Sequence, residues 1–470
     1  MDFFEPRMLY QRSIEGRAVG EFPLIYYLDA AIWQVTGISY RVMRLTNLLL
    51  VLFGLFALYK SIRLLTEDKF TAFLIPLFVF TAPVIAFYSC NYLVNVPALA
   101  FIYMSWYFFV AYYKKQRFGY LIAAALLAGM AGLLRVTMLI GFAPFIVFFV
   151  LEKVGLLRQN VFRHNSILSI LLLVFPFIIA FIWYDFAKHY NSVNKSVYFL
   201  TTIRPIWILD AQQIGQIWAQ IEAKKLDRIY NLWILPIFPL AILSFLATIK
   251  KQHAYWIVFT LTVMLGIGAY LLLWYSNLGV HDYYWIELFL LLPPLLYSLA
   301  YLLLRLPKSK YNPLWVKIPF VLILLISLVS TTALMRISYF YENSSFTRLF
   351  LNKKELESWQ WYHWYYEQKF KDFETIKPYL QSKGLQDDDL VAAMNDYTPN
   401  VTLSLMDQKG ISALYTKKLP LDEKMKYYIG KGAVWFLVTD TTEFNAALFR
   451  KFDATKVGEY GHVTIFKLKK

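Results

Sequence analysis

The first forty-three residues carry the chemistry that stands out most in the sequence. Charged residues, among them Glu5, Arg7 and Glu21, alternate there with aromatic residues. This composition is typical of a segment lying on a membrane surface, with aromatic rings among the headgroups and charges in water. The segment could be a simple amphipathic anchor. It could also hold a general base beside a lipid phosphate, with Glu5 and Arg7 as candidate binding residues.

A second polar group, His281, Asp282, Tyr283 and Tyr284, precedes a long apolar run. His and Asp at the start of a helix can serve simply to cap it. Four hydrogen-bonding side chains at one membrane boundary also suit recognition of a phosphate or a sugar. The sequence alone leaves both interpretations open. The pair Pro293-Pro294 is expected to distort the helix that follows.

A third candidate is Arg135, which lies between two apolar runs in GMAGLLRVTML. Its side chain could extend along the apolar surface to the outer interface. A lone Arg at that depth could equally pair with an anion such as a lipid phosphate. Asn95, in the turn before another apolar run, is a weaker candidate for substrate binding, because a polar turn needs no special explanation.

The composition indicates that membrane helices position these residues. Hydrophobic residues make up 59% of the 470 residues and charged residues only 17%. A soluble domain usually has about 25% charged residues, so the apolar surplus indicates contact with lipid. The net charge is +16, but the basic residues are scattered between apolar runs. We therefore expect membrane lipids, and not nucleic acid, as the partner of this charge.

Apolar runs of the length needed to cross a membrane, about 20 residues, recur along most of the chain. We predict about ten spans, near residues 44–63, 70–90, 92–112, 118–134, 137–152, 166–187, 230–249, 255–275, 283–304 and 315–337. The fourth and fifth are short and could form one helical hairpin around Arg135. The expected fold is mainly α, a polytopic helical bundle occupying residues 44–337.

Charge bias predicts the orientation of these spans. With residues 1–43 placed outside, five short turns on the opposite face are basic and the short outer turns carry only Arg135. The inner residues are Lys60, Arg63, Lys69, Lys114, Lys115, Arg117, Lys153, Arg158, Arg163, Lys250, Lys251, Arg305, Lys308 and Lys310. This positive-inside pattern places the three longer segments, 1–43, 188–229 and 338–470, on the extracytoplasmic face, where we expect the chemistry.

The segment 338–470 is expected to be a small soluble α/β domain. VWFLVT (434–439) and HVTIFKL (462–468) have the composition of strands, and residues 353–384 look helical. The domain could be a folded cap that orders the membrane domain, or it could contact substrate. The six His residues of the chain are dispersed. We therefore expect no metal site built by the protein alone, and a divalent cation only together with a substrate phosphate.

Three segments together resemble the membrane glycosyltransferases of the GT-C type. The segment EFPLIYYLDAAIWQVTG followed by RVMRLTNLLLVLFG is similar to their first outer loop and next helix. LLAGMAGLLRVTMLIGFAPF is similar to their glycine-rich helix that ends in a basic residue, here Arg135, and VHDYYWIELFLLLPPL to their late motif. The most similar branch is the protein-mannosyltransferase and aminoarabinose-transferase group, glycosyltransferase family 39. The resemblance covers about residues 1–340.

The resemblance implies an enzyme that takes a sugar from a polyprenyl-phosphate carrier and passes it to a lipid, glycan or protein on the outer face. The transfer inverts the anomeric centre, and a carboxylate of the first outer loop deprotonates the acceptor. Because the leaving group is a phosphate, a nearby cation such as Arg135 would stabilise the charge that develops. The resemblance names neither the sugar, hexose or pentose, nor the acceptor.

The sequence departs from the family at its start. The family has a transmembrane helix before the first outer loop, whereas this chain begins inside the loop. We therefore expect the working enzyme to have at least one more helix in front and its catalytic Asp upstream of Met1. In a complete chain, either Asp2 or Glu21 would act as the base, or the protein would be inactive.

Two other functions compete with glycosyl transfer. A transporter or lipid flippase often shows inverted repeats and charges at mid-membrane, and the sequence shows neither clearly. An inactive membrane scaffold that works through its C-terminal domain is the other alternative. The single cysteine, Cys90, lies in a predicted span, so no disulfide joins parts of the chain. An exposed domain without cysteine fits a bacterial inner membrane.

Overall fold

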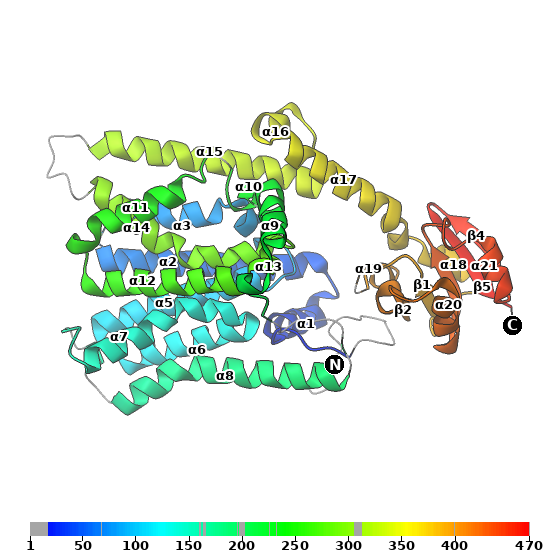
Figure 1. The fold of residues 1–470 in the computed structure, drawn as a ribbon, viewed down its shortest axis with the longest axis horizontal. Coiled ribbons are helices and arrows are strands. Elements are labelled where there is room, and N and C mark those ends of the chain that lie inside the picture. Colours follow the sequence, from blue (N-terminus) through cyan, green and yellow to red (C-terminus); the bar gives the residue numbers. More distant parts are fainter. Residues whose placement is uncertain are drawn as a thin grey trace. The chain divides into compact units, whose positions relative to one another are not determined.

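The computed structural model describes residues 17–469, apart from 67, 159–160, 163–165, 195, 197–202, 225, 232, 305–312 and 399. The chain divides into two compact units (Figure 1). The membrane unit consists of Glu21–Asp185 and Thr202–Asn352, and the second unit of Met1–Gly20, Phe186–Thr201 and Lys353–Lys470. Asp2, Glu5 and Arg7, three of the predicted site residues, lie outside the described residues.

Six helices in the described part of the chain are long and apolar enough to cross a membrane. They are α2 (Tyr40–Thr66), α5 (Asn95–Lys115), η1 (Val136–Gly141) continued by α7 (Ala143–Lys153), α8 (Ser166–Val193), α12 (Ala254–Leu273) and α15 (Pro313–Phe340). Two pairs of helices pass the same test together but are bent at a short break. α3 (Lys69–Phe80) and α4 (Pro83–Ser89) meet at 73°, and η4 (Asp282–Leu290) and α14 (Leu292–Leu304) meet at 50°. Counting each bent pair once gives up to eight spans.

The predicted helical membrane bundle is confirmed, and each of the ten predicted spans overlaps at least one helix of the described residues. Two of the predicted spans correspond to shorter helices, α6 (Phe118–Leu134) with 17 residues and α11 (Ile237–Thr248) with 12. A hydrocarbon core of about 30 Å needs ~20 helical residues. Apolar composition predicts that a segment lies in the membrane. It does not predict at which residue of that segment the helix begins.

The remaining helices of this unit are short connections. They are α1 (Leu24–Thr36), η2 (Ile206–Ile208), α9 (Ala211–Lys224), α10 (Leu226–Ile229), η3 (Ile249–Lys251), α13 (Tyr275–Leu278) and α16 (Ser345–Phe350). Among the long spans α5 is central: 78% of its apolar window is buried, against 28–39% for the other five. The outer helix α8 instead exposes large apolar side chains such as Phe181, as expected of a helix that faces lipid.

Close packing between α2 and α5 depends on a glycine. A Cβ added to Gly54 of α2 would lie 2.6 Å from the Cα and Cβ atoms of Ala100 on α5. Small residues at helix contacts allow backbones to approach closely, which is the main source of helix association in lipid.

We therefore expect Gly54→Ala to destabilise the membrane unit by about 1–3 kcal/mol through overpacking. Gly119→Ala in α6 is the matched control, because a Cβ there meets nothing within 4 Å. Thermal unfolding in detergent micelles measures both variants. Equal stability of the two variants would contradict the predicted helix contact.

The C-terminal part of the second unit is a five-stranded mixed sheet, as the α/β prediction required. The strand order is β2-β1-β3-β5-β4; β1 pairs in parallel with β2 and β3, and β5 pairs antiparallel with β3 and β4. The strands are β1 (Leu390–Ala393), β2 (Gly410–Ser412), β3 (Ala433–Val438), β4 (Ala454–Tyr460) and β5 (Val463–Leu468). β3 and β5 coincide with the two predicted strands.

Helices precede and cover this sheet. The predicted helical region 353–384 contains α17 (Lys353–Lys369), η5 (Lys371–Glu374) and α18 (Lys377–Ser382). The others are α19 (Val401–Leu405), η6 (Ala413–Thr416), α20 (Leu421–Gly430) and α21 (Ala446–Lys451). Two clusters of buried apolar residues form the core. Trp435 belongs to one cluster, and its neighbour on β3, Phe436, belongs to the other. Successive residues of a strand point to opposite faces, so both faces of the sheet are covered.

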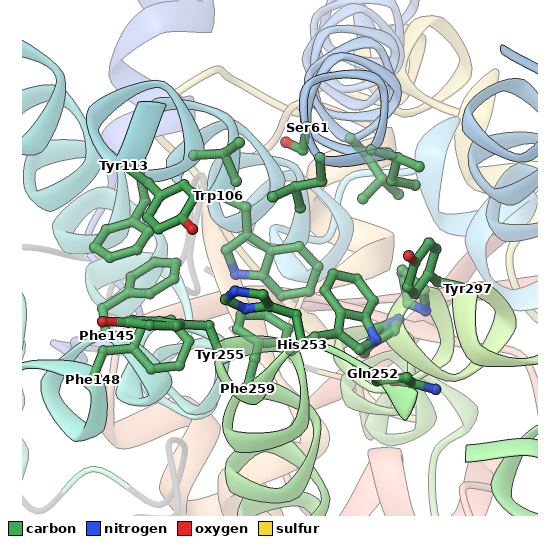
Figure 2. Close-up of a pocket in the computed structure, with 18 of the residues that line it drawn as sticks. Ser61, Trp106, Tyr113, Phe145, Phe148, Gln252, His253, Tyr255, Phe259 and Tyr297 are labelled. Atoms are coloured by element: carbon green, nitrogen blue, oxygen red, sulfur yellow. The ribbon is translucent and has the colours of Figure 1, made fainter. Parts of the chain in front are cut away.

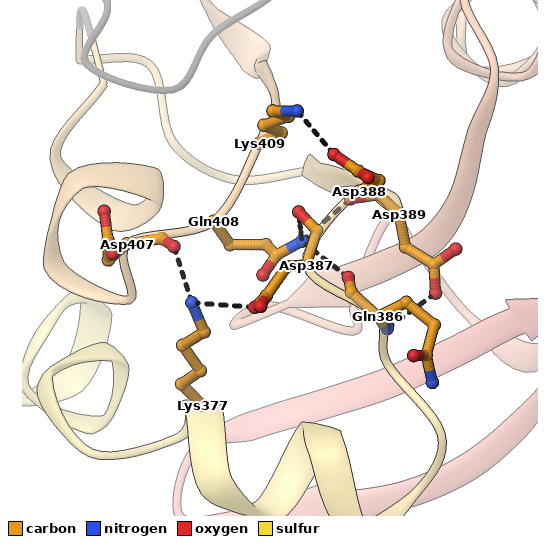
Figure 3. Close-up of polar contacts among 8 residues, drawn as sticks. All are labelled: Lys377, Gln386, Asp387, Asp388, Asp389, Asp407, Gln408 and Lys409. Atoms are coloured by element: carbon orange, nitrogen blue, oxygen red, sulfur yellow. Dashed lines mark hydrogen bonds and ion pairs between the residues drawn. The ribbon is translucent and has the colours of Figure 1, made fainter.

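A polar bracket fixes the turn before β1 (Figure 3). The amide nitrogen of buried Gln408 donates to the carbonyl oxygens of Gln386, Asp387 and Asp389. Two ion pairs support the same turn: Lys377 with Asp387 at 3.3 Å and Lys409 with Asp388 at 2.6 Å. Hydrogen bonding to Lys409 lowers the pKa of Asp388. The amide nitrogen of Gln408 and the two ion pairs are all satisfied within the chain, which makes the bracket a structural feature of the sheet domain.

Candidate functional site

An ion pair between Arg135 and Glu287 lies at the centre of the candidate site. Nε of Arg135 is 2.7 Å from Oε1 of Glu287, whose side chain is fully buried. The hydroxyl of Thr137 donates to the same oxygen over 2.7 Å. The other carboxylate oxygen, Oε2, has no hydrogen-bond partner among the described residues. Because an unsatisfied buried acceptor is costly, this oxygen is a natural contact for a ligand that donates a hydrogen bond.

Unusual backbone positions the pair. Helix α6 ends at Arg135, which is extended with φ −155° and ψ 103°. Thr137 follows in η1, a 3-10 helix of six residues, and Glu287 belongs to η4, a 3-10 helix of nine. Runs of 3-10 helix longer than 3–4 residues are uncommon, and they often mark functional positions or strain. The two runs are in contact, so both partners come from non-α backbone.

Aromatic side chains surround the guanidinium of Arg135. Its Cζ lies 5.2 Å from the centre of the Tyr284 ring, a cation–π geometry. The hydroxyl of Tyr270, near the end of α12, donates to the carbonyl of Tyr284 over 2.8 Å. Tyr184 of α8 accepts a hydrogen bond from the backbone N–H of Val136, next to Arg135. The Tyr284 ring thus contacts the guanidinium directly, while Tyr184 and Tyr270 fix the neighbouring backbone at Val136 and Tyr284.

The predicted cluster 281–284 is compact. The rings of His281 and Tyr283 stack with centres 4.9 Å apart, and Asp282 accepts a hydrogen bond from the hydroxyl of Tyr88 on α4 over 2.6 Å. His281 occupies the N-cap position of η4, but its side chain makes no capping hydrogen bond. The capping interpretation is therefore wrong for His281, which is exposed beside the aromatic rings.

Glu21 reaches the same region from the N-terminal segment. The next residue, Phe22, donates its backbone N–H to the carbonyl of Leu133 at the end of α6, and its ring packs edge-on against Trp183. Burial raises the pKa of Glu21 above its usual 4.5, while a backbone hydrogen bond and the nearby charge of Arg135 act in the opposite direction. A carboxyl with a raised pKa is a stronger base than an ordinary glutamate.

The structure thus brings most of the predicted residues together. Glu21 lies within electrostatic reach of Arg135, and Arg135 contacts Tyr284, which belongs to the 281–284 cluster. Arg135 does not extend to the interface as a lone charge, because it pairs with a buried carboxylate. Asn95 begins α5 and is buried, and its amide nitrogen has no hydrogen-bond partner among the described residues. In the described part of the chain, no hydrogen bond or ion pair links Asn95 to Arg135 or Glu287.

Sequence reasoning missed Glu287 and Asp29. Glu287 is the only carboxylate in the apolar run WIELFLLLPP, and an ionisable residue inside a membrane segment is by default a functional candidate. That signal could have found it. Asp29, on α1, is also buried, and neither of its oxygens has a hydrogen-bond partner within normal distance among the described residues. Burial raises its pKa, with Thr46 as a weaker opposing influence. In the sequence Asp29 is one acid among several in an amphipathic segment.

In the part of the chain that the structure describes, no group of three or more His, Cys, Asp or Glu is placed to hold a metal ion. The candidate site offers separate oxygen ligands, at Glu287 and Glu21.

Known proteins give two independent likenesses. Residues 20–183 match the family model described as dolichyl-phosphate-mannose-protein mannosyltransferase. The fold is similar to the crystal structure of ArnT from Cupriavidus metallidurans in the apo state, with a TM-score of 0.54, 11% identity and coverage of 96% of this chain and 88% of that one. The resemblance to the GT-C type is confirmed. The chain has the GT-C fold. No curated protein sequence matches it.

A second ArnT structure from the same organism, bound to undecaprenyl phosphate, matches equally well. Its TM-score is 0.54 at 10% identity, and the alignment covers 99% of this chain and 90% of that one. Identity at this level shows a shared GT-C fold. The family model, in contrast, matches the sequence itself over the segment that carries Glu21, Arg135 and Trp183. Glu287 and the 281–284 cluster lie outside that match.

Proposed function

We propose that the protein is a membrane glycosyltransferase that moves a hexosyl or pentosyl group from a polyprenyl-phosphate carrier to a lipid, glycan or protein acceptor. The observation that carries this proposal is the placement of Glu21, a carboxyl with a raised pKa, beside Arg135 at one end of the bundle. The GT-C fold and the family match support it, as does the undecaprenyl phosphate bound by one structural relative.

In the proposed reaction the acceptor hydroxyl gives its proton to the carboxylate of Glu21. The acceptor oxygen then attacks the anomeric carbon, and the bond from that carbon to the phosphate oxygen breaks with inversion. The electron pair leaves with the lipid phosphate, where negative charge develops. Arg135 faces this charge with the guanidinium donors that Glu287 does not use. Its fixed position means that little reorganisation accompanies the reaction.

The residues around this pair are proposed to hold the donor. Exposed His281 and the Tyr283 and Tyr284 rings supply hydrogen bonds and a stacking surface for a sugar or phosphate. A divalent cation, when the reaction uses one, is proposed to be held jointly by the lipid phosphate and the site carboxylates. The charge bias of the loops supports an extracytoplasmic site in a bacterial inner membrane.

The test incubates purified protein with radiolabelled undecaprenyl-phosphate sugars and candidate acceptors. We expect sugar transfer by the wild type, and a loss of about tenfold or more in His281→Ala, which removes one hydrogen-bonding contact to the donor. His462→Ala is the control, since His462 lies on the exposed β4–β5 hairpin and pairs with Asp372. Carrier movement across vesicles without sugar transfer would instead favour a flippase, and neither activity would favour a scaffold.

A further inference from the structure

A cavity lies at the opposite end of helix α12 from the Arg135 site. Its volume is about 540 Å³, within the range of small-molecule sites. Tyr270, near the end of α12, contacts the candidate active site, whereas His253, Tyr255 and Trp256, at the start of the same helix, line the cavity. At 1.5 Å per residue these positions are ~20 Å apart. The cavity is therefore separate from the proposed glycosyl-transfer site.

Aromatic rings from several helices form the wall of this cavity (Figure 2). Trp106 and Phe145 both pack against Phe259, with ring centres 5.1 and 6.1 Å apart, and Phe148 packs edge-on against Tyr255 at 4.9 Å. Aliphatic side chains of the wall include Leu58 and Ile62 of α2 and Val110 of α5. Such a wall suits a hydrocarbon chain, because it offers apolar surface in fixed orientations.

The charged residues of the lining all have one sign. Lys114, at the end of α5, and Lys251, before α12, are exposed. The described residues that line the cavity include no Asp or Glu. Glu152 lies behind the wall, where it accepts hydrogen bonds from Tyr255 and from the backbone N–H groups of residues 161 and 162. This carboxylate is thus satisfied, and the mouth of the cavity favours an anion.

One donor in the lining is unsatisfied. The indole N–H of Trp256 is buried and has no hydrogen-bond partner among the described residues. A buried N–H group normally finds a partner, because leaving it unpaired costs free energy. An ester carbonyl or phosphate oxygen of a bound lipid would supply the missing acceptor.

We propose that this cavity binds a phospholipid with an anionic headgroup, such as a phosphatidylglycerol of the adjoining leaflet. One acyl chain lies against the aromatic wall, the phosphate lies near Lys114 and Lys251, and Trp256 donates to an oxygen at the base of the headgroup. The cavity lies apart from the Arg135 site, so the carrier lipid is not the expected occupant. The proposal does not depend on glycosyl transfer.

The experiment uses the full chain in nanodiscs that contain a phosphatidylglycerol with a photoactivatable acyl chain. We expect crosslinks to map to α5 and α12 residues of the wall, between 106 and 113 and between 253 and 259. Lys114→Ala with Lys251→Ala should reduce capture by about 30-fold, because each of the two basic contacts near an anionic headgroup contributes about 1 kcal/mol. The control variant, Lys60→Ala with Lys115→Ala, removes the same charge from exposed residues that do not line the cavity.

A second variant separates charge from shape. Val110→Trp places a large ring in the cavity and should abolish the wall crosslinks while the protein still elutes as a folded species. Undiminished crosslinks in this variant, or equal capture in the two lysine variants, would overturn the proposal. Equal capture of a zwitterionic lipid would overturn it too, as would displacement by equimolar undecaprenyl phosphate.

Discussion

Replacing Glu21 with glutamine is expected to lower the rate of sugar transfer by about 10²–10⁴-fold, the usual contribution of a general base. Glutamine keeps the size of the side chain and its contacts near α6, but it cannot take the acceptor proton. Initial rates with a saturating radiolabelled donor measure the effect. Glu342→Gln is the control, because Glu342 forms a partly exposed pair with Arg336. Full transfer by Glu21→Gln would remove Glu21 from the mechanism.

The pH dependence of transfer gives a separate check on the same residue. A general base works only when deprotonated, and burial raises the pKa of Glu21 above 4.5. The rate of the wild type should therefore fall as the pH drops through this raised pKa, at a higher pH than an ordinary glutamate would show. The residual rate of Glu21→Gln should lack this acidic limb. An acidic limb that persists unchanged in the variant would point to another base.

Glu287→Gln is expected to destabilise the membrane unit by about 3–5 kcal/mol, because it leaves Arg135 as an uncompensated charge in a largely buried position. Thermal unfolding in micelles, followed by loss of the monodisperse species, measures the change. Glu342→Gln is the matched control, because Glu342 pairs with Arg336 at a partly exposed position. We expect it to change the free energy of unfolding by less than about 1 kcal/mol.

A double variant distinguishes the charge effect from lost packing. Arg135→Met with Glu287→Met removes both charges, so it should cost less than the sum of the two single changes. A double variant that is as unstable as that sum would show that the pair contributes through packing alone. Transfer activity of the double variant should still be lost, since the cation that faces the leaving phosphate is gone.

Local sequence patterns predicted which helices and strands exist better than they predicted the residues at which these elements begin and end. The strands β3 and β5 and the break at Arg135 follow from composition over a few residues. The bend between α3 and α4 and the late start of α11 were missed, because a helix can end inside an apolar run without a change in composition. Pro83 and Pro236 stand directly at these points, so a closer weighting of proline would have helped.

The site required information that no local pattern holds. Arg135 and Glu287 are 152 positions apart in the sequence, and their pairing depends on how η1 and η4 pack. Arg135 was recognised because a lone charge in an apolar run is conspicuous, and the same signal was present for Glu287. The buried state of Asp29 could not be read from its sequence, since α1 is amphipathic and either face could meet α2.

The 3-10 winding of η4 sets a distance as well as a direction. From Asp282 to Glu287 a 3-10 helix rises by ~10 Å, and an α-helix would rise by only ~7.5 Å. The rotation per residue also differs, by about 20° between a 3-10 helix and an α-helix. Over the five residues from Asp282 to Glu287, α winding would therefore turn Glu287 by ~100° from its present direction. The 3-10 pitch of η4 therefore allows Asp282 to contact Tyr88 while Glu287 contacts Arg135. A substitution that rewinds η4 would uncouple the two ends without touching either contact.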